Sequence, residues 1–161
     1  FDESRFAKMT IKKNIGFRSL SIDEIDLGML AIYSHTVTDA DVKAYAGISG
    51  DNNPAHMSDE YANKSGFRAR IAHGLYGAGF FSALFGTKLP GPGCIYVSQN
   101  LRFKKPVYLG DTVTAEVSVT SIDIRKRRVF FDTVCTVDNR IVIDGEAEIY
   151  IPKPNRTSQK S

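Results

Sequence analysis

A carboxylate and an imidazole lie five positions apart in the segment Ser49-Gly50-Asp51-Asn52-Asn53-Pro54-Ala55-His56. Pro54 lies between Asp51 and His56 and favours a turn or an extended loop, which can point both side chains into one cavity. Such a pair can hold one water molecule, remove a proton from it and return a proton to carbon. The residue types therefore suit acid–base catalysis, although an isolated Asp after Ser-Gly is more often a turn former and an isolated His more often structural.

A second candidate feature is Ala72-His73-Gly74, which precedes a long apolar segment. The first turn of a helix has N–H groups without intrahelical partners and carries the positive end of the helix dipole. The N–H of Gly74 can therefore approach and stabilise a developing enolate oxygen, or the glycine merely begins the helix. We interpret His73 as a positioning residue rather than a second base. Ser82 either bonds its own helix backbone or orients Asp51.

The elements that position these residues can be predicted from apolar periodicity and capping residues. Around the Asp51–His56 loop, one strand and two short helices are expected at 30–37, 40–49 and 58–64. A helix at 74–88 is apolar nearly all round, which indicates burial on most sides. Period-two alternation then predicts antiparallel strands at 95–103, 112–119, 129–137 and 141–151. We therefore expect an α+β fold in which a sheet wraps around one long helix.

Composition limits the classes of protein to consider. The 161 residues are 42% hydrophobic and 24% charged, as in a single globular domain, and contain no apolar run of about 18 residues that would predict a membrane span. The net charge is +3, and the only basic run, Arg125–Arg128, is too short to favour nucleic-acid binding. The first residues do not resemble a signal peptide, and Cys94 and Cys135 lack metal-ligand spacing. These features predict a cytoplasmic protein with reduced thiols.

Together the segments resemble the MaoC-like hydratases, the hydratase-2 family of (R)-specific enoyl-CoA hydratases. The resemblance rests on Tyr45 followed by Ser-Gly-Asp-x-Asn-Pro-x-His, on Ala62 six residues after the histidine, and on the stretches IAHG, FFSALFG, LPGPG and SQNLRFKKPVYLGDTVTAEV. Ala55 departs from the pattern, in which a larger aliphatic residue precedes the histidine. The resemblance covers about 30–151, which predicts an N-terminal extension at 1–29, a hot-dog domain at 30–151 and a flexible tail at 152–161.

The resemblance implies a hot-dog fold acting as a homodimer, with the active site at or near the subunit interface. It implies that Asp51 and His56 are the catalytic pair and that the Gly74 N–H is the oxyanion donor. Supporting roles are implied for Ser82 and Asn53, and substrate contacts for His73, Leu75 and Tyr76. The reaction would be hydration of a trans-2-enoyl thioester, or the reverse dehydration of an (R)-3-hydroxyacyl thioester. Because hydration is redox-neutral, no cofactor or metal is expected.

Other functions remain open at this point. The same site can serve a 3-hydroxyacyl-ACP dehydratase of fatty-acid synthesis, because the sequence does not distinguish CoA from an acyl carrier protein. Hot-dog folds also include thioesterases, but the Asp-x-Asn-Pro-x-His loop argues against hydrolysis. A non-catalytic protein that binds acyl thioesters is a further alternative, disfavoured because Asp51 and His56 are both present. Neither a nucleic acid nor a membrane is expected as a partner.

Overall fold

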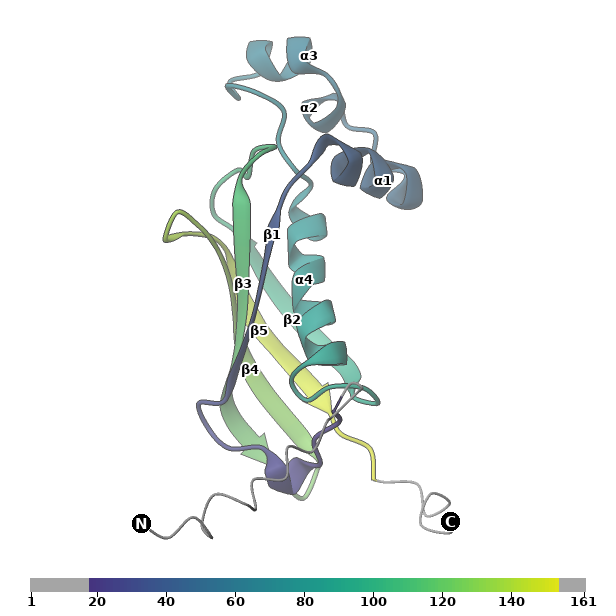
Figure 1. Ribbon diagram of the computed structural model, residues 1–161, viewed down its shortest axis with the longest axis vertical. Helices are drawn as coiled ribbons and strands as arrows, with labels where there is room; N and C mark the ends of the chain where they lie inside the picture. The colour runs from purple at the N-terminus through teal and green to yellow at the C-terminus, as the bar shows by residue number, and fades with distance from the viewer. Residues whose placement is uncertain (1–17, 154–161) are drawn as a thin grey trace, which may run out of the picture.

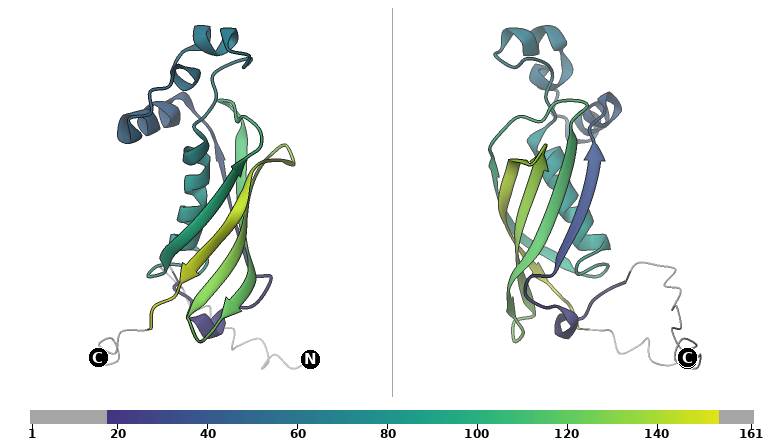
Figure 2. Two further views of the ribbon diagram at one scale, coloured as in Figure 1. Left: turned by 180° about the vertical axis from the view of Figure 1, so that it is seen from behind. Right: turned by 60° about the vertical axis from the view of Figure 1, so that its left-hand side comes forward.

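A five-stranded antiparallel sheet packs against one long helix in the computed structural model, which describes residues 18–153 (Figure 1). The strand order is β1-β3-β4-β5-β2, so β1 and β2 form the two edges. The strands are β1 (Leu30–Thr36), β2 (Ile95–Phe103), β3 (Thr112–Asp123), β4 (Arg128–Val137) and β5 (Arg140–Tyr150). The sheet curves around helix α4 (Gly74–Thr87), which lies along its concave face (Figures 1 and 2). The predicted α+β class and the sheet wrapped around a helix are confirmed.

The core lies between α4 and the inner face of the sheet. Alternate side chains of β3 point inward and are buried, namely Val113, Ala115, Val117 and Val119. From the helix, Phe81, Leu84 and Phe85 meet them, each at most 1% exposed. Burial of one such side chain contributes about 1.5–3 kcal/mol, so these contacts fix α4 against the sheet and fix the position of its N-terminus.

Three short helices between β1 and α4 lie above the N-terminal end of α4 (Figure 1). They are α1 (Asp39–Ser49), α2 (Pro54–Met57) and α3 (Asp59–Lys64). A capping box joins Thr38 and Asp41 at the start of α1, and the Ser58 hydroxyl caps α3 by accepting from the Tyr61 N–H, as their sequences predict. The expected loop at 51–56 differs, because Asn53 caps a helical turn that begins at Pro54 and carries His56.

The structure near the N-terminal boundary of the predicted domain shows that the core begins before residue 30. Ile22, in the 3-10 turn η2 (Ile22–Glu24), and Ile25 belong to the buried core, so packing extends N-terminal to residue 30. The divisions at 29/30 and 151/152 stay predictions, and residues 1–17 and 154–161 lie outside the described part of the chain. Within 18–153, no helix is long and apolar enough to cross a membrane.

Candidate active site

Asp51 is held by its own loop. Gly50 ends α1 in the left-handed conformation, with φ of 77°, and turns the chain sharply before Asp51. The Asp51 N–H donates to Ser49 Oγ at 3.1 Å, and the Asn53 N–H donates to Asp51 Oδ1 at 3.2 Å. These contacts form a local turn that fixes one carboxylate oxygen and leaves Oδ2 available for another partner.

His56 is presented by α2 in a defined tautomer. Asn53 Oδ1 accepts a hydrogen bond from the Ala55 N–H at 3.0 Å, which caps the helix just before His56. The ring nitrogen Nδ1 of His56 lies 2.7 Å from the carbonyl oxygen of Ile71. Because a carbonyl oxygen only accepts, Nδ1 carries the proton, and in the neutral ring Nε2 has a free lone pair. Asn53 therefore supports both Asp51 and His56.

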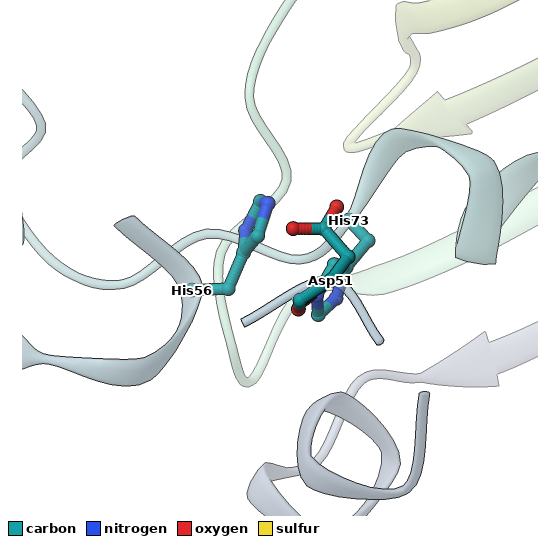
Figure 3. Close-up of side chains that lie close together, drawn as sticks. All are labelled: Asp51, His56 and His73. Atoms are coloured by element: carbon teal, nitrogen blue, oxygen red, sulfur yellow. Dashed lines mark hydrogen bonds between the residues drawn. The ribbon is translucent and has the colours of Figure 1, made fainter. Parts of the chain in front are cut away.

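His73 contacts both members of the pair (Figure 3). Its Nε2 donates to the main-chain oxygen of Asp51 at 2.9 Å, and its ring centroid lies 3.9 Å from that of His56. The side chain is 3% exposed and also packs on Tyr45, at 4.8 Å between centroids. Asp51, His56 and His73 bring possible metal ligands within 4.8 Å of one another. The hydrogen bond from His73 goes to the Asp51 main chain, which suits a positioning role.

A cavity of about 430 Å³ joins these groups to the start of α4. Asp51, His56 and Gly74 all line it, and Gly74 is the first residue of the helix, where N–H groups lack intrahelical acceptors. Its deep wall consists of buried apolar residues, namely Val37, Val113 and Ile143. A mostly apolar cavity with a few convergent polar groups is typical of a small-molecule site.

Leu75 and Tyr76 line the same cavity, as their predicted substrate contacts require. Burial raises the pKa of Tyr76, so this side chain remains a neutral phenol. The cavity also contains a residue that the sequence interpretation did not single out. The ring of Phe103 covers Gly74 so closely that a Cβ there would lie 2.6 Å from Phe103 Cε1. The alternation of β2 gives no signal for this contact, because it depends on how the strand end meets α4.

Ser82 makes no hydrogen bond with Asp51 within this chain, so its orienting role stays a prediction. Ser82 lies eight residues beyond Gly74 in α4, or about 12 Å along the helix axis. It is exposed and does not line the cavity, and the hydrogen bonds of Asp51 go to other groups.

Residues 23–141 match the protein family described as MaoC like domain. The chain belongs to the MaoC-like family. It is 49% identical over 130 residues to an (R)-specific enoyl-CoA hydratase of Rhodospirillum rubrum, covering 81% of this chain and 90% of the relative. It is 42% identical over 136 residues to a 3-hydroxybutyryl-CoA dehydratase of Methylorubrum extorquens, covering 84% and 87%.

The MaoC-like fold is also found among solved structures. The R-hydratase PhaJ1 from Pseudomonas aeruginosa, in its unliganded form, superimposes with a TM-score of 0.80 at 39% identity. The match covers 84% of this chain and 88% of that structure. The family resemblance and the hot-dog fold expected from the sequence are therefore confirmed.

Proposed function

We propose that this MaoC-like protein is an (R)-specific enoyl-CoA hydratase, which adds water to trans-2-enoyl-CoA and also catalyses the reverse dehydration. The observation that carries the proposal is the convergence of Asp51 and His56 on a largely apolar cavity at the N-terminus of α4. The similarity to named hydratases and dehydratases that act on CoA thioesters supports it. The enzyme is a hydro-lyase.

The mechanism follows from the groups that face the cavity. The Gly74 N–H donates a hydrogen bond to the thioester carbonyl oxygen and stabilises the enolate charge that develops there. The free oxygen of Asp51 and Nε2 of His56 hold one water molecule, whose oxygen bonds to the β-carbon of the substrate. The proton that leaves this water is held by the pair and returned to the α-carbon, so that hydration consumes one water and releases nothing.

The test of this function is the loss of enoyl-thioester absorbance with crotonyl-CoA, followed by chiral analysis of the product. The proposal predicts turnover and an (R)-3-hydroxybutyryl-CoA product. Release of free thiol would indicate thioester hydrolysis instead. Absence of turnover on enoyl-CoA, together with turnover on an enoyl-ACP, would favour the fatty-acid-synthesis dehydratase.

We further propose that the chain forms a homodimer through strand β2 and the adjoining face of α4. As an edge strand, β2 has unpaired backbone groups, and its side chains Ile95, Tyr96 and Val97 are exposed. Ser82 lies on the exposed side of α4, where a second chain would cover it. Light scattering should give twice the mass of one chain for wild type, and Val97→Lys should shift the mass toward that of one chain. A monomeric wild type would contradict the proposal.

We propose the cytoplasm as the compartment of the reaction. Cys94 and Cys135 are both free thiols, which suits a reducing environment. Burial raises the pKa of Cys135 to about 12, so this thiol is protonated and unreactive at neutral pH. Fractionation of cells that express the tagged protein should recover it with cytoplasmic markers, and recovery in another fraction would contradict this location.

A further inference from the structure

A second hollow lies beside the active-site cavity and shares two lining residues with it. Its volume is about 310 Å³, and Lys105 and Pro106 line both spaces. Two segments that line the cavity, around Ile71 and around Val107, lie side by side, and Tyr108 of the second segment also lines the hollow. The Ala72 N–H donates to the Val107 oxygen at 2.7 Å, and a β-bridge follows between Ile71 and Tyr108. This hollow, which we call the basic groove, therefore adjoins the cavity that contains the proposed catalytic pair.

Three cationic side chains line the basic groove, namely Arg68, Lys105 and Arg140. Within the described part of the chain, none of the three has a carboxylate oxygen within ion-pair distance, whereas the neighbouring Lys104 lies 3.0 Å from Asp144. None of these three cations is therefore held in an ion pair in this part of the chain, and they outnumber the two carboxylates that also line the groove, Asp111 and Asp138. The arrangement favours an anionic ligand.

Two residues of the basic groove, Arg68 and Asp111, are already held by contacts with Tyr108. The guanidinium of Arg68 lies over the ring of Tyr108, 4.3 Å from its centroid, which restricts its motion. Asp111 and Asp138 also line the groove, but the Asp111 carboxylate accepts the Tyr108 N–H at 2.8 Å. The groove is thus a concave site with partly ordered cations, a form that fits a small polyanion better than the convex surface of a folded carrier protein.

We propose that the basic groove binds the phosphates of the nucleotide end of coenzyme A. This inference rests on the proposed function, because it takes the acyl thioester to lie in the adjoining cavity. An acyl-CoA joins its thioester to its phosphates through the uncharged pantetheine arm, which would run past Lys105 and Pro106. Guanidinium groups bind phosphate oxygens through paired, charge-assisted hydrogen bonds, so Arg68 and Arg140 are the residues that recognise the carrier.

The experiment compares wild type with Arg68→Gln/Arg140→Gln, which removes two charges outside the active-site cavity. Arg125→Gln is the matched control, because Arg125 is an exposed cation in the β3–β4 turn, at the opposite end of the sheet from α1–α3 (Figure 1). Calorimetric titration with free coenzyme A gives the Kd without requiring turnover. Kinetics are measured on crotonyl-CoA, on crotonyl-ACP and on crotonyl-N-acetylcysteamine, a thioester that lacks every phosphate.

The double variant should raise the Kd for coenzyme A and the KM for crotonyl-CoA about 10-fold at low salt, with less effect at high salt. Its kcat, and its kcat/KM on the N-acetylcysteamine thioester, should stay within about twofold of wild type, and the control should resemble wild type throughout. The proposal is overturned if the Kd and KM for the CoA compounds do not change. It is also overturned if kcat/KM falls equally for crotonyl-CoA and for the N-acetylcysteamine thioester, or if only the KM for crotonyl-ACP rises.

The two proposals fail in different ways. If wild type hydrates no thioester but its coenzyme A affinity still depends on Arg68 and Arg140, the reaction is wrong and the groove assignment stands. If wild type hydrates both small thioesters and the double variant binds coenzyme A normally, the reaction stands and the groove assignment is wrong.

Discussion

The side chain of His73 holds the main chain of Asp51, with Nε2 of the imidazole 2.9 Å from the Asp51 carbonyl oxygen. The same ring packs on His56, and His73 is also the residue that precedes the first turn of α4. One buried side chain thus links the Asp51 loop, the His56 helix and the Gly74 N-terminus. The relative positions of the three proposed catalytic groups depend on it.

Replacement of His73 by Phe keeps an aromatic ring but removes the N–H donor. We expect kcat to fall by about 10- to 100-fold, because small displacements of catalytic groups have effects of this size. KM should change less, since most of the cavity wall is untouched. Steady-state kinetics on crotonyl-CoA, with thermal unfolding as a check of folding, measures the effect. A well-folded variant with wild-type kcat would refute the positioning role.

Gly74→Ala tests the space above the start of α4. The new Cβ would lie 2.6 Å from Phe103 Cε1, so the ring must move. Because Phe103 is 54% exposed, it can rotate away, and we expect stability to fall by only about 1 kcal/mol. The kcat should fall about 10-fold or more, since the methyl group crowds the oxyanion position. The double variant with Phe103→Ala should recover stability but not kcat, and recovery of both would contradict a role for the Gly74 N–H.

Asp41→Ala tests the start of α1. Hydrogen bonds from His35 and then Thr38 hold the pKa of Asp41 well below its usual range. Removal of the carboxylate should lower the free energy of unfolding by about 1–2 kcal/mol at pH 7. Because the folded-state pKa is depressed, this contribution is present above the unfolded pKa of about 4 and is lost as pH falls below it. Urea unfolding at pH 7 and pH 2.5 measures the difference, which should shrink in acid; a difference that grows would contradict the assignment.

Gly145→Ala tests the pairing of β2 with β5. A Cβ at Gly145 would lie 1.9 Å from the Asn100 carbonyl oxygen, and backbone cannot move aside as a side chain can. We expect a loss of about 3 kcal/mol or more, or failure to fold. The control is Gly47→Ala in α1, where the new Cβ has no neighbour within 4 Å and should be neutral or stabilising by up to about 1 kcal/mol. Similar stability for both variants would contradict the β2–β5 register.

Local signals in the sequence predicted most of the fold. Period-two alternation located the four long strands, and in β3 and β4 alternate side chains are buried in the core as that pattern predicts. The edge strand β2 differs, because none of its residues is buried within one chain. Caps were equally clear, as at Thr38 and Gly50, since they depend on neighbouring residues alone. The Asp51–His56 spacing also indicated a joint role, although it did not show that Pro54 begins a helical turn.

The remaining features depend on contacts between distant segments. Phe103 meets Gly74 only because the end of β2 lies beside the start of α4, and Arg68 meets Tyr108 through a bridge between two loops. Whether Ser82 orients Asp51 likewise depends on tertiary or subunit contacts, because a shared family pattern carries no information about distance. Contacts of this kind can be identified only from the three-dimensional structure.

The catalytic role of Asp51 and His56 is the central claim, and the most direct test is the rate of crotonyl-CoA hydration by Asp51→Asn and His56→Ala beside wild type. Both residues lie at the cavity surface, so we expect both variants to fold, as circular dichroism would check. Each kcat should fall by about 10²- to 10⁴-fold, and the double variant should be little worse than the more affected single one, because the two groups act on one water. Hydration within about twofold of wild type by either folded variant would contradict the account.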